Sequence, residues 1–154
     1  MKILFLDGLG SNPTGRKPAF LRDHGFEVVY PILPDWDFDG AVRTAQDAFD
    51  ADRPDVIVGY SRGGAVAMNM TSGEVPLVLL APAWKFRGTA NVVKPGTLVL
   101  HSPDDVLVPI DDSRELLRNS GLPESALREI GEEHDMTHPD ALSALLEAVA
   151  SFRD

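Results

Sequence analysis

The 154-residue sequence contains no cysteine. This absence excludes disulfide bonds, thiolate metal sites and a cysteine nucleophile. Long apolar runs are also absent, since no run approaches the length of a membrane-spanning helix. The first apolar run, residues 2–6, is short and is followed by Asp7, so we interpret it as a core strand rather than a signal peptide. These features predict a cytoplasmic protein.

Positive charge is scarce: 14 Lys and Arg residues stand against 24 Asp and Glu residues, giving a net charge of −10. Such a chain repels nucleic acid and anionic membrane surfaces, so we expect neither as a partner. The composition, 44% hydrophobic and 25% charged, is typical of a globular protein. Because no repeat or linker interrupts the sequence, we expect one domain over residues 1–154.

Apolar, β-branched runs alternate with segments of helical periodicity. This alternation predicts an α/β fold, an open and mostly parallel six-stranded sheet with helices on both faces. The expected strands are residues 2–6, 26–30, 56–59, 76–80, 97–101 and 126–130. The expected helices are residues 18–24, 40–50, 61–72, 112–120 and 139–153, with residues 84–93 left as a loop or a short irregular helix.

One strand-to-helix junction carries the sequence Gly-Tyr-Ser-Arg-Gly over residues 59–63. This G-x-S-x-G pattern is typical of a nucleophile elbow, in which a sharp turn strains the serine and leaves no room for a Cβ two residues to either side. Ser61 is therefore a candidate nucleophile. The alternative is an ordinary turn in which Ser61 only caps the following helix.

A serine hydroxyl needs a histidine to accept its proton and a carboxylate to orient that histidine. In an open parallel sheet, ligands bind at the carboxyl ends of the strands. Ser61, Asp105 and His134 each follow a different expected strand, in that order along the chain. Asp104 is the alternative acid and His138 the alternative base, whereas His24 and His101 are expected to be structural. A metal site formed by His134 and His138 is disfavoured because Pro139 interrupts a helix through both.

With these motifs the chain resembles a small, lidless serine hydrolase of the α/β-hydrolase superfamily, over nearly its whole length. The resemblance is carried by Gly59–Gly64, by His101–Pro109, where Asp105 stands four residues before Pro109, and by His134 after the last strand. It implies a minimal α/β-hydrolase fold without a cap domain, a catalytic triad of Ser61, Asp105 and His134, and no cofactor.

An oxyanion hole needs two backbone N–H donors, and Leu9 and Arg62 are the candidates. Related chains generally begin the first of these loops with His-Gly, where this chain has Asp7-Gly8. Asp7 either faces the pocket and weakens oxyanion binding, or bonds to nearby backbone N–H groups and is harmless. The side chain of Arg62 either pairs with a neighbouring acid or binds an anionic group of the substrate.

The aromatic residues Trp36, Trp84 and Phe86 fall on loops at the same sheet edge, where they either wall a substrate pocket or cover the core. Trp36 and Trp84 are therefore candidate substrate-binding residues. The sequence thus predicts a carboxylesterase-like serine hydrolase acting on a small ester or thioester. The alternative is a binding or regulatory protein that keeps the hydrolase scaffold but has lost useful catalysis, with Asp7 as its sequence marker.

Overall fold

The structure is a computed structural model and describes residues 1–153. Six strands pair in parallel to form one open sheet in the order β2-β1-β3-β4-β5-β6. The strands are β1 (Lys2–Leu6), β2 (Glu27–Val29), β3 (Val56–Tyr60), β4 (Leu77–Leu80), β5 (Leu98–His101) and β6 (Leu127–Glu129). The expected α/β architecture is therefore confirmed, with every strand within one residue of its expected bounds.

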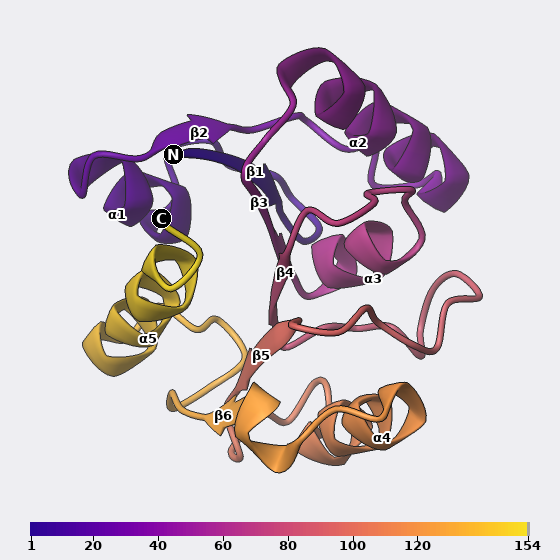
Figure 1. Ribbon diagram of the computed structural model, residues 1–154, viewed down its shortest axis with the longest axis vertical. Helices are drawn as coiled ribbons and strands as arrows, with labels where there is room; N and C mark the ends of the chain where they lie inside the picture. The colour runs from indigo at the N-terminus through magenta and orange to yellow at the C-terminus, as the bar shows by residue number, and fades with distance from the viewer. Residues whose placement is uncertain (154) are drawn as a thin grey trace.

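The helices lie on both faces of the sheet (Figure 1). They are α1 (Arg16–Asp23), α2 (Phe38–Asp52), α3 (Arg62–Met68), α4 (Ile110–Ser120) and α5 (Pro139–Ala150), with a short 3₁₀ turn, η1 (Glu124–Ala126), before β6. Helices α1 and α5 cover one face, and α2, α3 and α4 cover the other. No helix within residues 1–153 is long and apolar enough to cross a membrane.

Two apolar layers form because successive strand side chains point to opposite faces of a sheet. In β1, Leu4 and Leu6 pack in the layer beneath α2, α3 and α4, while Ile3 and Phe5 pack in the layer beneath α1 and α5. These four side chains are fully buried. Burial on both faces explains why the strands read as continuous apolar runs rather than as an alternating pattern.

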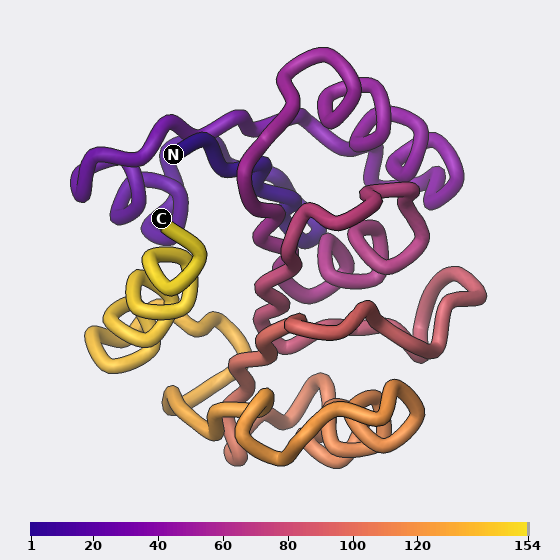
Figure 2. Tube along the Cα trace, viewed as in Figure 1, coloured from indigo at the N-terminus to yellow at the C-terminus, as the bar shows by residue number. Residues whose placement is uncertain are grey.

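Helix α3 ends at Met68, four residues before the expected end at Ser72. Asn69 ends the helix: its side-chain amide donates to the carbonyl of Ala65 at 2.8 Å, while its side-chain oxygen accepts the N–H groups of Thr89 and Ala90 at 3.2 Å. The chain between β4 and β5 therefore runs beside α3 as an irregular loop (Figure 2).

The strand order positions the site. From β1 the chain continues to β2 on one side, whereas β3 lies on the other side of β1. The connections therefore diverge between β1 and β3, and the crevice at such a switch point is where open α/β sheets bind ligands. Gly8, which follows β1, and Ser61, which follows β3, are neighbours there: a Cβ on Gly8 would lie 3.5 Å from that of Ser61.

Candidate active site

The turn between β3 and α3 holds Ser61 in a strained backbone conformation, with φ 55° and ψ −117°. Non-glycine residues rarely adopt a positive φ, and such strain is concentrated at functional sites. The turn is tight on both sides: a Cβ on Gly63 would lie 2.0 Å from the carbonyl oxygen of Leu6, and one on Gly59 would lie 2.7 Å from that of Gly63. The geometry is that of a nucleophile elbow.

Ser61 does not cap helix α3 with its side chain. Its Oγ instead lies 2.8 Å from Nε2 of His134, and Nδ1 of His134 lies 2.6 Å from Oδ2 of Asp105. Because an ionised carboxylate can only accept, Nδ1 carries the proton and Nε2 is free to accept the hydroxyl proton of Ser61. The structure thus brings together the three residues expected from the sequence, and the helix-cap interpretation of Ser61 is wrong.

Asp105 is fixed by its own loop. Its Oδ1 accepts the backbone N–H groups of Leu107 and Val108, each at 2.8 Å. Burial alone would raise the pKa of the Asp105 carboxyl, but the N–H donors of Val108 and Leu107 and the side chain of His134 outweigh it and hold the pKa below its usual value. Asp105 is therefore ionised and correctly oriented to accept from His134 at neutral pH.

A second histidine, His101, contacts the carboxylate of Asp105. His101, fully buried at the end of β5, directs Nε2 at Oδ2 of Asp105 (3.2 Å) and at the carbonyl of Val108 (3.0 Å), and its Nδ1 lies 2.7 Å from Oγ of Ser113 on α4. Burial lowers the pKa of His101 more than these acceptors raise it. The ring is thus neutral: Nε2–H donates to both oxygens, and Nδ1 accepts from the Ser113 hydroxyl.

Lys17 of α1 contacts the loop that carries His134. This lysine is 8% exposed, and its Nζ donates to the carbonyl of Asp135 at 2.8 Å. The ammonium group also lies 3.8 Å from the ring centroid of Tyr60, a cation–π contact, and the Tyr60 ring in turn lies 5.4 Å from that of His134. Burial lowers the pKa of Lys17, against the opposing effect of Asp7 and Asp135.

A cavity of about 450 Å³ opens beside Ser61 and His134. Leu9 and Arg62 both line it, and within residues 1–153 their backbone N–H groups donate to no protein acceptor. An oxyanion hole requires two free N–H donors of this kind beside the nucleophile, for which Ser61 is the candidate. The lining is completed by residues that are mainly apolar or aromatic: Gly8, Tyr60, Ala83, Phe86, Arg87, Leu107 and Val108.

Asp7 does not line this cavity. Its Oδ1 accepts the N–H of Gly8 at 2.8 Å, and its Oδ2 accepts the hydroxyl of Tyr30. Burial and the Asp7 carboxylate together raise the pKa of Tyr30, so this hydroxyl stays protonated and remains a donor. Of the two alternatives for Asp7, the structure therefore favours local hydrogen bonding.

The two tryptophans do not line the cavity, so the structure lends no support to the prediction that they bind substrate. Trp84 is buried in the core, where its indole N–H donates to the carbonyl of Asp112 at 3.0 Å. Trp36 is 98% exposed and does not line the cavity. Phe86 is the one aromatic residue of the three that lines it. The sequence placed all three on loops but could not give the direction of each side chain.

The alternative acid and base lie in other surroundings. Asp104 is exposed, and the ring nitrogens of His138 lie 3.3 Å from a carboxylate oxygen of Glu132 and 3.6 Å from one of Glu133. His24 bonds to the carbonyl of Phe20 on its own helix. Within the described part of the chain, no group of three or more His, Asp or Glu side chains is arranged to hold a metal ion.

Comparison with solved structures identifies the fold. No protein-family model and no curated protein matches the chain. Among solved structures, α/β-hydrolase domain-containing protein 10 from mouse matches at 16% identity and a TM-score of 0.78, over 97% of this chain and 88% of that one. Est1E from Butyrivibrio proteoclasticus matches at 15% identity and a TM-score of 0.73, over 98% and 86%. The chain has the α/β-hydrolase fold.

A third α/β-hydrolase match is the esterase domain of a Rhodothermus marinus protein, at 16% identity and a TM-score of 0.66, over 98% of this chain and 84% of that one. The sequence analysis did not identify two sets of contacts that hold the site in place. His101, bonded to Ser113, donates to Asp105, and Lys17 donates to the loop that carries His134. The position of His101 just before the acid loop was a usable signal. Lys17 gave none, because 118 positions separate it from Asp135.

Proposed function

We propose that the protein is a serine hydrolase that cleaves a small carboxylic ester or thioester through an acyl-enzyme on Ser61. The observation that carries the proposal is the hydrogen-bonded series from Ser61 Oγ to His134 to Asp105, 2.8 and 2.6 Å long, at a strained elbow that opens on a cavity. The likeness in fold to the esterase domain of the Rhodothermus marinus protein supports the same class of reaction.

The proposed reaction has two steps of acyl transfer. Ser61 Oγ attacks the carbonyl carbon while Nε2 of His134 takes its proton, and the N–H groups of Leu9 and Arg62 hold the oxyanion. His134 then protonates the leaving alcohol or thiol as the carbon–heteroatom bond breaks. Water, deprotonated by His134, attacks the acyl-enzyme, releases the acid and returns the proton to Ser61. Asp105 stabilises the imidazolium and is not itself protonated.

The cavity supports small substrates. A volume of about 450 Å³ lies in the lower part of the range typical of small-molecule sites. Leu9, Phe86 and Leu107 are each more than half exposed at its edge, so the cavity is open to solvent. An open, partly apolar site favours esters with good leaving groups over amides, which need tighter protonation of the leaving amine.

A fluorophosphonate probe tests the proposal because it reacts only with an activated serine. We expect rapid labelling of the wild-type protein, no labelling of Ser61→Ala, and rates reduced by roughly 10³-fold or more in His134→Ala. Hydrolysis of short para-nitrophenyl esters should fall in parallel.

Two matched variants serve as controls. Asp104→Asn and His138→Gln change the neighbouring acid and histidine, and both should label at close to the wild-type rate. Absence of labelling in folded wild-type protein would contradict the proposal and favour the binding-protein alternative. Asp7 gives that alternative no support, because its carboxylate is engaged by Gly8 and Tyr30.

A further inference from the structure

The cavity beside Ser61 differs in charge from the rest of the protein. The chain carries ten more acidic than basic residues, yet the cavity lining includes two arginines, Arg62 and Arg87, and no Asp or Glu. Local charge of this sign concentrates anions and lowers their energy in a partly desolvated site.

Arg87 supplies a free charge at the edge of the cavity. Its side chain is exposed, and its Nη1 donates only to the carbonyl of the adjacent Phe86, at 3.0 Å. Within residues 1–153 no carboxylate forms an ion pair with it. The guanidinium therefore keeps several N–H donors for a ligand.

Arg62 supplies a second, buried charge at the start of α3. It is 5% exposed, and Nη2 donates to the carbonyl of Pro34 at 2.7 Å. Its Nε and Nη1 are shielded from solvent and have no partner among the described residues. Asp35 and Asp37 act on Arg62 through space, and within residues 1–153 neither forms an ion pair with it. Unpaired donors on a buried cation are costly, and an anion bound nearby would offset part of that cost through its charge.

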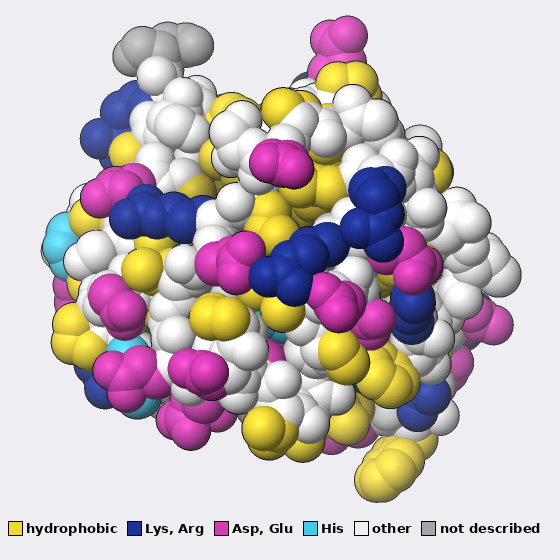
Figure 3. Space-filling view, turned by 90° about the horizontal axis from the view of Figure 1, so that it is seen from below, with side chains coloured by type: hydrophobic (Ala, Val, Ile, Leu, Met, Phe, Trp, Pro, Cys, Tyr) yellow, Lys and Arg dark blue, Asp and Glu magenta, His cyan; other side chains and the backbone are white. Residues whose placement is uncertain are grey.

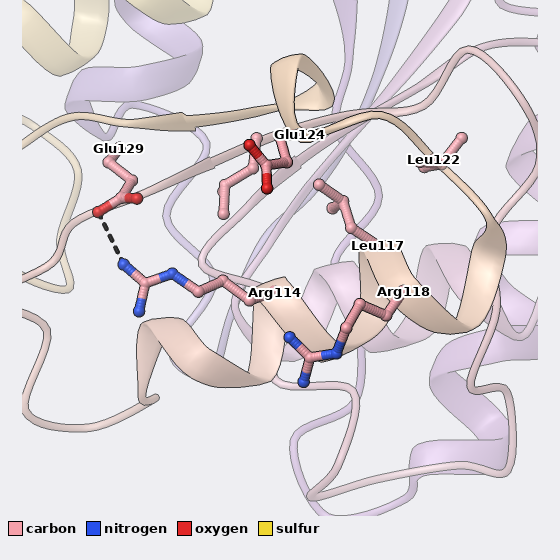
Figure 4. Close-up of a pocket in the computed structure, with 7 residues that line it drawn as sticks. Arg114, Leu117, Arg118, Leu122, Glu124 and Glu129 are labelled. Atoms are coloured by element: carbon pink, nitrogen blue, oxygen red, sulfur yellow. Dashed lines mark hydrogen bonds and ion pairs between the residues drawn. The ribbon is translucent and has the colours of Figure 1, made fainter.

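A second groove is lined by equal numbers of basic and acidic residues. It lies between α4, η1 and β6, and it is also lined by two arginines, Arg114 and Arg118, but here Glu124 and Glu129 line it with them (Figure 4). Arg114 donates to Glu129 at 2.9 Å. The face seen from the α4 and β6 side likewise has basic side chains beside acidic ones (Figure 3). The cavity at Ser61 differs from this groove in that its two arginines have no carboxylate beside them in the lining.

From these observations we infer that the cavity selects substrates that carry a carboxylate near the reacting ester or thioester, bound by Arg87 and attracted by the charge of Arg62. This inference names a substrate class and rests on the proposed hydrolase function. A carboxylate accepts two parallel N–H bonds from a guanidinium, a geometry that an ammonium cannot match. The class includes half-esters and half-thioesters of short dicarboxylic acids.

Binding to a protein that cannot turn over tests the inference separately from catalysis. Ser61→Ala protein is titrated with monomethyl glutarate, an anion, and with dimethyl glutarate, its neutral counterpart, by NMR chemical-shift perturbation. We expect the anion to bind about fivefold or more tightly at low ionic strength, and the difference to shrink as salt is added. Equal affinity, tighter binding of the neutral ester, or no binding of the anion would overturn the inference.

Variants then assign the effect. In wild-type protein, kcat/KM for para-nitrophenyl hydrogen glutarate is compared with that for para-nitrophenyl pentanoate. Arg87→Gln should reduce this ratio by about three- to fivefold, and Arg62→Met by a similar factor. Arg118→Gln, which removes one charge from the groove at α4, should leave the ratio unaltered. A ratio that Arg87→Gln does not change would overturn the assignment, and that variant, on an exposed side chain, is expected to fold.

The two proposals fail in different ways. If fluorophosphonate labelling fails but Ser61→Ala protein still prefers the anion, the cavity is an anion site without hydrolase chemistry. If labelling succeeds but neither binding nor kinetics favours the anion, the hydrolase proposal stands and the substrate class is wrong.

Discussion

His101 donates to Oδ2 of Asp105, the same oxygen that accepts the Nδ1 proton of His134. One carboxylate oxygen therefore accepts hydrogen bonds from two imidazoles, that of buried, neutral His101 and that of His134 at the cavity. Removing the His101 donor should strengthen the hydrogen bond that His134 Nδ1–H donates to Asp105, because less of the negative charge of the carboxylate is offset elsewhere.

His101→Phe tests this effect on activity. We expect kcat to fall by about tenfold because Asp105 loses one orienting bond, with KM little changed. His101→Gln, which retains an N–H donor, should have a kcat closer to that of wild type. A kcat of His101→Phe equal to that of wild type would show that His101 only fills space.

The pH dependence of stability should also report on His101. Burial lowers the pKa of this residue in the folded protein, so the unfolded chain binds its proton first as the pH falls. The contribution of neutral His101 to the free energy of unfolding is complete above the pKa of about 6.5 that histidine has in the unfolded chain. It is lost as the pH falls toward the lower pKa of His101 in the folded protein. The free energy of unfolding of His101→Gln should therefore decline less steeply with acid below about pH 6.5, as urea denaturation at a series of pH values would measure. Parallel pH curves would contradict this.

Lys17→Met should disturb the His134 loop. The substitution removes the bond to the carbonyl of Asp135 and the cation–π contact with Tyr60. We expect faster hydrogen exchange in residues 132–136, slower fluorophosphonate labelling and a loss of about 1–3 kcal/mol in stability.

Lys94→Met is the matched control. Lys94 is a lysine that donates to three oxygens, those of Ser72, Gly73 and Val75, away from the loop that carries His134. It should lose comparable stability while labelling at the wild-type rate. If both variants label equally slowly, Lys17 contributes general stability rather than loop position.

Gly63→Ala should fail at the elbow. The added Cβ would lie 2.0 Å from the carbonyl oxygen of Leu6 and 2.6 Å from that of Asp7, both backbone atoms that cannot move away cheaply. We expect a loss of about 3 kcal/mol or more, or no folded protein, as thermal denaturation would show. Gly121→Ala separates crowding from conformation: φ is 65° there, but no atom lies within 4 Å of the added Cβ. It should cost only about 1–2 kcal/mol. Equal costs for the two variants would contradict the crowding argument.

The sequence by itself determined the sheet and the three residues of the Ser61 series. Residues 56–60 could be interpreted alone, because an apolar run and the glycines of a tight turn are local signals. Asp105 and His134 followed from their places after parallel strands, since the carboxyl ends of such strands meet at one edge.

Only the tertiary structure decided the rest, because each remaining feature depends on the direction of a side chain or on contacts between distant segments. Trp84 turns inward to Asp112, while Phe86, two residues later, turns to the cavity. Helix α3 ends at Met68, where the side-chain oxygen of Asn69 accepts the N–H of Thr89 from a loop twenty positions later. Lys17 reaches Asp135 across 118 positions. Local propensity carries no record of such packing, which forms only when the helices cover the sheet.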